Sequence, residues 1–451
     1  MPYIAHSSRD VEEMLEKIGV KSIDELFAAI PECARFDGAL DIPPAASELT
    51  IQRELQRVGR EMVTLDQVNA FLGGGVYDHF IPCIVDHLAG RAELYTAYTP
   101  YQPEASQGTL TAIFEYQSMI AALTGMDVSN ASVYDGASAV AEAVLMAASI
   151  QRRKRNIVVS SALHPEHIAT VRTYLANIDN ELVVVPTTDG VTDPTALADA
   201  VDENTACVAF ANPNFNGCLE DVFRLAEVTH QAGALLIACV EPHSLGVVVP
   251  PGEYGADIAV GEGQGLGGEV WYGGPYFGFF TAKREHVRKM PGRIAGLTED
   301  DQGRRGVVLT FQTREQHIRR AKATSNICTN QGIIAMRGAM YLAALGPQGM
   351  REIAAQCIAK SHYAADRICE LDGYSLAFDA PFVKEFTVRT PRPAEDICGE
   401  LADDAILPGL PLSRWYPDRE NELLVAVTEK KTREEIDALA DALGRVAGGA
   451  R

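Results

Sequence analysis

The pattern of apolar and polar positions divides the chain into regions of different character. Up to about residue 72, apolar residues recur at helical spacing, and capping-box sequences at Ser22 and Thr64 predict helix starts. From about 108 to 330, short continuous apolar runs alternate with helical patterns, which is typical of a mostly parallel sheet covered by helices on both faces. Beyond 330, two helices followed by short strands and a last helix predict an α+β domain.

The same pattern predicts individual elements. In the α/β region we expect strands at 132–134, 157–160, 182–186, 206–211, 235–240 and 258–260, a further strand at 276–281 that could run antiparallel, and helices at about 108–124, 136–151, 165–177, 193–202 and 219–232. In the C-terminal region we expect helices at 332–345 and 348–371, strands at 374–378, 384–389 and 422–428, and a helix at 432–446.

Residues 73–107 interrupt the periodicity with glycines, prolines and many aromatic residues. A structureless connection of this length is usually functional or disordered, and leaving so many aromatic rings in water is costly. We therefore predict that this segment is ordered. The expected organisation is a helical N-terminal arm (1–72), this loop rich in aromatic residues, glycine and proline (73–107), which the family resemblance given below places at a subunit interface, a large α/β domain (108–330) and a C-terminal α+β domain (331–451).

Composition narrows the classes of function. The formal net charge of −22 argues against nucleic acid and anionic membrane surfaces as partners. The nine cysteines are scattered and never spaced C-x-x-C, and no apolar run is long enough to span a membrane. The prediction is a soluble cytoplasmic protein with no metal site.

A glycine-rich stretch follows the predicted strand at 258–260, with Gly263, Gly265 and Gly268 in the order G-x-G-x-x-G. This spacing marks a dinucleotide loop only where a helix follows at once, and residues 269–275 are poor helix formers. Nicotinamide or flavin binding is therefore disfavoured. No lysine occurs between Lys154 and Lys283.

The start of the predicted helix at 136 is a candidate phosphate turn. Gly136, Ala137 and Ser138 are small residues at a helix N-terminus, where backbone N–H groups and the helix dipole favour an anion. Close packing of the helix on the sheet explains the same residues equally well.

Two further residues lie at predicted strand ends. His164 either stacks on a planar ring or caps the next helix, and although His167 lies nearby, no third ligand has the spacing of a metal site. Glu241 either faces a protonated pyridine nitrogen or is a solvated loop acid. Taken in order, the small-residue turn, the histidine, an Asn-Pro turn at 212–213 and the strand-end acid reproduce the elements of fold-type I pyridoxal-phosphate enzymes, the aspartate aminotransferase-like fold.

Four longer stretches carry a more specific resemblance. The stretches are YTAYTPYQPEASQG (95–108), VYDGASA (133–139), GEGQGLG (261–267) and TREQHIRRAKATSNIC (313–328). With them, and over nearly its whole length, the chain resembles the glycine dehydrogenase (decarboxylating) family, the P-proteins of the glycine cleavage system. Within that family it resembles the alpha subunits (subunit 1) of two-subunit enzymes.

The resemblance implies an enzyme whose beta subunit carries the lysine that binds pyridoxal phosphate. In such chains this lysine follows the strand-end acid by roughly two dozen residues, and here that count reaches Gly265, which has no amine for a Schiff base. Gly136, Ala137, Ser138, His164, Glu241 and Gly265 would then form a vestigial site. With the beta subunit, the enzyme would decarboxylate glycine and pass the aminomethyl group to the lipoyl arm of H-protein.

The resemblance leaves the role of this chain open. The tyrosine-rich loop could reach the pocket of the beta subunit, with Tyr95 and Tyr98 first and Thr96 next, or these residues could only pack the interface. In the second case the chain is a catalytically silent pseudo-aminotransferase that stabilises its partner. An autonomous enzyme using Lys283 or Lys322 is disfavoured because neither follows the required strand. The basic stretch 314–322 either forms a docking surface that steers an acidic H-protein, or lines a lipoyl channel, or is an exposed helix face.

Overall fold

The computed structural model describes residues 5–36, 38–327 and 330–447, which fall into two compact units, 1–63 and 64–451. The first unit contains α1 (Ser8–Ile18), α2 (Glu48–Glu61) and the short 3-10 turns Asp24–Phe27 and Glu32–Ala34. The capping box predicted at Ser22 is wrong, because the Glu25 carboxylate accepts a hydrogen bond from the backbone N–H of Lys21 (3.1 Å). The box at Thr64 is confirmed.

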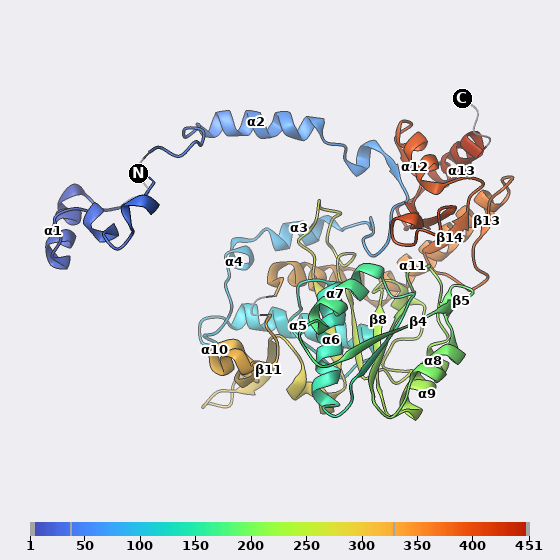
Figure 1. Ribbon diagram of the computed structural model, residues 1–451, viewed down its shortest axis with the longest axis horizontal. Coiled ribbons are helices and arrows are strands. Elements are labelled where there is room, and N and C mark those ends of the chain that lie inside the picture. Colours follow the sequence, from blue (N-terminus) through green and yellow to red (C-terminus); the bar gives the residue numbers. More distant parts are fainter. Residues whose placement is uncertain (1–4, 37, 328–329, 448–451) are drawn as a thin grey trace. The chain divides into compact units, whose positions relative to one another are not determined.

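The second unit is built on a seven-stranded sheet (Figure 1). Five adjacent strands, β9, β8, β7, β3 and β4, are parallel to one another. The strand predicted at 276–281 is β10, and it runs antiparallel to β9. In spatial order the strands are β2 (Val128–Ser129), β10 (Gly278–Ala282), β9 (Ile258–Glu262), β8 (Leu235–Val240), β7 (Thr205–Asn212), β3 (Asn156–Ser160) and β4 (Glu181–Val185).

The predicted strand at 132–134 is wrong. Val133 makes only an isolated bridge to Gly278, and the strand of this edge ends at Ser129. The backbone turns in between, because the Asn130 side chain accepts a hydrogen bond from Ser132 N (2.9 Å) and Ser132 has a φ of 97°. A short polar side chain has overridden the apolar pattern.

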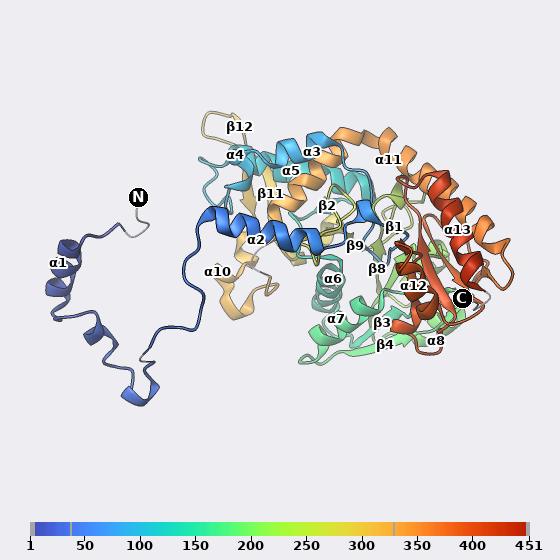
Figure 2. The same ribbon diagram turned by 90° about the horizontal axis from the view of Figure 1, so that it is seen from above.

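Helices cover both faces of this sheet, as predicted (Figure 2). One face is covered by α6 (Gly136–Ile150) and α7 (Pro165–Leu175). The other face is covered by α5 (Gln107–Thr124), α9 (Val222–Gln231) and α11 (Gly332–Cys369). Alternating residues along each strand point toward the two helix layers. The shorter α8 (Pro194–Ala200) contacts β4 and α9. Burial on both faces explains why β7 and β8 are apolar without alternation.

The C-terminal part is an antiparallel sheet with helices. Its strands are β13 (Ser375–Leu376), β14 (Glu385–Arg389), β17 (Glu422–Ala426) and β16 (Leu410–Pro411), accompanied by α12 (Ala394–Ala402) and α13 (Arg433–Ala447). The predicted break in α11 is confirmed by Gly346, whose φ of 62° precedes Pro347. Phe71 belongs to this core, and β1 (Asn69–Ala70) pairs with β15 (Ile406–Leu407).

Several elements carried no clear pattern in the sequence. The segment 73–107 contains α3 (Cys83–Ala89) and α4 (Ala92–Tyr95), so it is not only a loop. Two hairpins were also missed, β5–β6 (Thr187–Thr188, Val191–Thr192) and β11–β12 (Ile294–Glu299, Arg305–Thr310). The short remaining helices are α10 (Gln316–Arg319) and 3-10 turns at Leu65–Gln67, Ser244–Gly246, Arg284–Lys289, Gln312–Arg314, Arg320–Lys322 and Leu412–Arg414. Among the described residues, no helix has the length and apolarity that a bilayer crossing requires.

Candidate functional site

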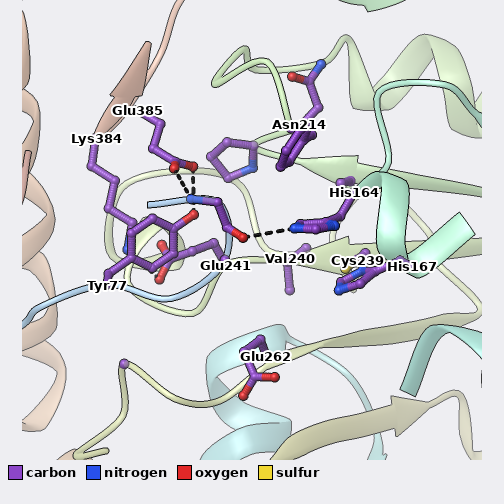
Figure 3. A pocket seen from close by; sticks show the side chains of 16 residues that line it. Tyr77, His164, His167, Asn214, Cys239, Val240, Glu241, Glu262, Lys384 and Glu385 are labelled. Carbon is purple, nitrogen blue, oxygen red and sulfur yellow. Dashed lines mark hydrogen bonds and ion pairs between the residues drawn. The ribbon is translucent and has the colours of Figure 1, made fainter. Parts of the chain in front are cut away.

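A pocket lies at the carboxyl ends of β7, β8 and β9, where ligands bind in open α/β sheets (Figure 3). Its cavity has a volume of about 80 Å³. Three of the residues predicted from the sequence line it, namely His164, Glu241 and Gly265. The C-terminal part contributes Lys384 and Glu385, and the segment before α3 contributes Tyr77.

The glycine-rich segment 73–75 runs along the pocket and joins its two sides. Gly74 N donates to Oε1 of Glu385 (2.6 Å), and Gly74 O accepts from Nε2 of His164 (3.0 Å) (Figure 3). A Cβ at Gly73 would lie 2.1 Å from Glu385 Oε1, and Gly74 has a φ of 73°. The glycines are therefore required by this close passage.

Glu241 directly follows β8, and its carboxylate contacts several polar groups of the pocket and of the network behind it. Its Oε1 lies 2.8 Å from the Lys384 ammonium and 3.1 Å from both Nδ1 and backbone N of His243, while its Oε2 accepts from Ser244 N (2.8 Å). Burial opposes ionisation, but Lys384 and the hydrogen bond from His243 outweigh it and hold the pKa of Glu241 well below its usual range. The carboxylate is ionised and paired.

Two stacked histidines extend this network. The rings of His79 and His243 are 3.8 Å apart, and His79 accepts from Lys384 Nζ at Nε2 (2.9 Å) while its Nδ1 lies 2.6 Å from Glu429. Burial, with His243 and Lys384 nearby, lowers the pKa of His79 to about 3. His79 is thus neutral and donates from Nδ1 to Glu429.

The same histidines and Glu241 could in principle hold a metal ion, since their ligand atoms lie within 4.8 Å of one another. The Lys384 ammonium, however, already contacts Glu241 and His79. A second group, His79 with Cys357 and Glu429, shares the same occupied histidine. The cation position of this cluster is filled by a side chain.

Glu262 ends β9 and faces the start of α6. Its Oε2 accepts from Gly136 N (2.9 Å), its Oε1 accepts from Gln264 N (3.0 Å), and Asp135 caps the same helix through Ser138 N (2.7 Å). Burial raises the pKa of Glu262 to about 8. A Cβ at Gly136 would lie 3.0 Å from Cβ of Glu262, so the small residues here also permit close packing of helix and strand.

Replacing Glu262 with glutamine is expected to flatten the dependence of stability on pH. The folded carboxyl keeps its proton up to about pH 8, whereas the unfolded one loses it above about 4.5. The folded state therefore loses stability as pH rises from about 4.5 to 8, by at most about 1.4 kcal/mol per pH unit. Glu262→Gln cannot titrate, so its unfolding free energy relative to the natural chain should grow across this range.

Urea unfolding at pH 5, 6, 7 and 8 measures this difference, and the exposed Glu269→Gln is the matched control. We expect the control to keep the slope of the natural chain. An identical slope in Glu262→Gln and the natural chain would show that Glu262 is already ionised at neutral pH.

His164 begins α7 and packs among aromatic rings. Its Nδ1 accepts from Glu166 N (3.1 Å), so it caps the helix, and its ring lies 4.5 Å from Phe215 and 4.9 Å from His167. Burial lowers the pKa of His164, and burial with His164 nearby lowers that of His167 to about 3. Both rings are neutral, and Nδ1 of His167 has no hydrogen-bond partner among the described atoms.

The glycines of the G-x-G-x-x-G stretch serve packing. A Cβ at Gly263 would lie 2.2 Å from the ring of Phe277, and one at Gly268 would lie 2.7 Å from Gln264 O. At Gly265 a Cβ would lie 2.8 Å from Cε1 of His243. No helix begins within 264–277, so the dinucleotide interpretation fails as expected.

The other predicted site residues lie elsewhere on the second unit. Tyr95 ends α4, Thr96 and Tyr98 follow it, and none of the three lines the pocket. Tyr95 and Tyr98 are 62% and 83% exposed, so their phenol rings are available to a partner. In the basic stretch, Arg314 is buried and donates to the backbone oxygens of Met290 and Gly292, so it belongs neither to a docking surface nor to an exposed helix face.

Seven further residues of the site were not predicted from the sequence. Tyr77, Glu262, Lys384 and Glu385 line the pocket, and His79, His243 and Glu429 belong to the hydrogen-bond network behind Glu241 and Lys384. His243 could have been suspected because it follows Glu241 by two positions. Lys384 had no local signal, since it precedes a strand of the C-terminal sheet. Tyr77 donates to Glu385 Oε2 (2.6 Å), and its ring lies 3.6 Å from Lys384 Nζ.

One family model, one relative and one solved structure agree on the family that this chain is similar to. Residues 1–443 match the family described as "Glycine cleavage system P-protein". The chain is 48% identical to a probable glycine dehydrogenase (decarboxylating) subunit 1 of Carboxydothermus hydrogenoformans, with 98% of this chain and 99% of that relative covered. It is similar to a crystal structure of glycine decarboxylase (P-protein) of the glycine cleavage system in inhibitor-bound form, with a TM-score of 0.91, 44% identity, and 99% and 100% coverage.

A more distant likeness concerns the fold alone. Glutamate decarboxylase of Lactobacillus brevis aligns with a TM-score of 0.68 at 14% identity, over 92% of this chain and 96% of that one. The predicted fold class, the fold-type I pyridoxal-phosphate enzyme fold with a mostly parallel central sheet, is confirmed.

Proposed function

This chain belongs to the glycine cleavage system P-protein family, and we propose that it is the alpha subunit of a two-subunit glycine dehydrogenase (decarboxylating). The observation that carries the proposal is the likeness to a subunit 1 along almost the full length of both chains. The TM-score of 0.91 with a glycine decarboxylase supports it further. The substrate is glycine, and the partners are the beta subunit and lipoylated H-protein.

In this proposal the beta subunit holds pyridoxal phosphate, which withdraws the electrons left when the carboxylate of glycine departs as carbon dioxide. The aminomethyl group goes to the lipoyl arm of H-protein, whose disulfide is reduced. This chain contributes no lysine to that chemistry at the expected position, which is Gly265. Its contribution is a surface that completes the pocket of the partner.

The exposed tyrosines support this contribution. The hydroxyls of Tyr95 and Tyr98 have no hydrogen-bond partner among the described residues, whereas Thr96 donates to Ala92 O within its own helix. Tyrosine is enriched at interfaces because its ring buries apolar surface while its hydroxyl donates a hydrogen bond. We infer that Tyr95 and Tyr98 orient the glycine carboxylate and exclude water in the pocket of the beta subunit, with Thr96 shaping the turn between them.

A catalytically silent scaffold is the second candidate. The fully paired Glu241 favours it, because a pocket whose charges are satisfied internally stabilises a fold without ligand. Both candidates require the beta subunit, and they differ only in what the tyrosine hydroxyls do. We place either one in the cytoplasm, where free buried thiols such as Cys207 and Cys239 remain reduced.

The requirement for a partner is tested by glycine–bicarbonate exchange. The purified chain with pyridoxal phosphate and lipoylated H-protein should show only the background rate. Addition of the beta subunit should raise the rate by at least about 10²-fold, because the electron-withdrawing group and its lysine arrive with it. The beta subunit assayed without this chain is the matched control. Exchange by this chain without the beta subunit would contradict the proposal.

A further inference from the structure

The pocket at the ends of β7, β8 and β9 has the place of a fold-type I cofactor site, but most of its polar groups already have partners within the chain. A phosphate in this fold would need free backbone donors at the start of α6. Gly136 N donates to Glu262 and Ser138 N donates to Asp135. To bind more than the N–H of Ala137, a phosphate here would have to displace one carboxyl group and approach a second, so the helix start fits the group poorly.

The position for a pyridine nitrogen is occupied as well. A carboxylate offers about four lone-pair sites. In Glu241 the Oε1 atom contacts the Lys384 ammonium and accepts from Nδ1 and backbone N of His243, while Oε2 accepts only from Ser244 N. The ammonium supplies the positive charge that a protonated pyridine would otherwise bring to this acid. A protonated ring nitrogen at the remaining site of Oε2 would place a second positive charge beside that ammonium, so it could pair with Glu241 only if Lys384 moved away, and that would leave the Lys384 charge buried.

The position for a lysine is closed by the histidine pair. A Cβ at Gly265 would lie 2.8 Å from Cε1 of His243 and 3.2 Å from Cδ2 of His79. His243 cannot give way freely, since Glu241 holds its Nδ1 and Tyr341 OH lies 3.0 Å from its Nε2. A longer side chain at 265 therefore has no room unless the stacked rings separate.

We propose that side chains of this chain occupy the positions that pyridoxal phosphate would need, so that the pocket excludes the cofactor even if a lysine is restored. Glu262 occupies the phosphate position and Lys384 the position of the pyridinium charge. The stacked rings of His79 and His243 occupy the space of the lysine side chain. The cavity of about 80 Å³ agrees, since a cavity of about 150 Å³ is what holds a single benzene ring. Under the proposed function, on which this consequence rests, each alpha–beta pair carries one cofactor, in the beta subunit.

The proposal is tested on the full chain without a partner, so it can fail independently of the exchange reaction. The probe is pyridoxamine 5′-phosphate, which has the ring and the phosphate but no aldehyde to label surface lysines. In equilibrium dialysis the natural chain should not reach half-saturation at about 1 mM probe. Lys384→Met/Glu262→Ala should bind at least about tenfold more tightly, because it frees Glu241 and the start of α6.

The matched control is Lys322→Met/Glu269→Ala, which changes the same residue types at exposed positions and should bind like the natural chain. Stoichiometric binding by the natural chain at micromolar concentration would overturn the proposal. So would an opened variant that is folded by circular dichroism and binds no more tightly than the control. If Lys384→Met/Glu262→Ala does not fold, the affinity of the natural chain for pyridoxamine 5′-phosphate tests the proposal by itself.

A second arm examines the lysine position directly. Gly265→Lys is incubated with pyridoxal phosphate, reduced with borohydride and digested, and the pyridoxyl group is located by mass spectrometry. We expect labelling at position 265 to be no greater than at exposed lysines. Preferential labelling at position 265 in folded protein would show that only the lack of a lysine prevents the pocket from binding pyridoxal phosphate, and would overturn the proposal.

Discussion

Replacing Lys384 with methionine is expected to lower the free energy of unfolding by about 3–5 kcal/mol, because it leaves the Glu241 carboxylate buried without its cation. The two side chains are only 3% and 13% exposed, and their charged atoms are 2.8 Å apart. His79 would also lose the hydrogen bond from Lys384 Nζ. Urea unfolding at pH 7 measures the loss.

Two companion variants isolate the cause. Lys322→Met removes an exposed lysine and should change stability by less than about 0.5 kcal/mol. Lys384→Met/Glu241→Gln removes both charges and should recover at least about 1 kcal/mol of the loss through pairwise coupling. If Lys384→Met costs no more than the surface control, the ammonium does not stabilise this pocket.

Tyr98→Phe and Tyr95→Phe should each lower the rate of glycine–bicarbonate exchange by the reconstituted enzyme by about 10²-fold. Each removes one hydroxyl that we assign to orienting the glycine carboxylate in the pocket of the beta subunit, and a substrate misplaced by about 1 Å can react about 10²-fold more slowly. The phenol rings remain, so the alpha–beta contact should persist. Exchange is measured with the beta subunit and lipoylated H-protein, and complex formation is followed by analytical ultracentrifugation.

Tyr272→Phe is the matched control, since it removes a hydroxyl that is equally free and 99% exposed but lies in a different segment. It should leave both rate and assembly unchanged. Full exchange activity in Tyr95→Phe and Tyr98→Phe would refute the catalytic assignment and leave the scaffold function. Lost assembly in the phenylalanine variants would instead assign the hydroxyls to the interface itself.

The α/β core could be predicted because the pattern of apolar residues that marks each strand and helix lies within a short segment of the chain. Strands buried on both faces need continuous apolar residues, and β7 and β8 were placed within one or two residues of their ends on that basis. The kink in α11 was visible from Gly346 and Pro347. The prediction of a strand at 132–134 was wrong because the Asn130 side chain turns the backbone there, and the pattern of apolar residues does not show such a turn.

The candidate site was only half visible for the same reason. His164, Glu241 and Gly265 lie at strand ends, where the alternation of elements already marks a ligand site. Their companions Tyr77 and Lys384 come from segments that the alternation does not include. The sequence thus predicted a pocket at these strand ends, with glycine at position 265, but it did not show which charged side chains meet there.

By itself, then, the sequence determined the fold class and predicted the position of the pocket, because apolar periodicity and the order of strand ends are properties of short segments. The tertiary structure alone decided which charges meet there. Packing of the C-terminal sheet against the pocket brings Lys384 to Glu241, and the passage of 73–77 brings Tyr77 to Glu385. Electrostatic pairing depends on distance in space, and buried charges far apart in the chain acquire partners only when the whole unit has folded.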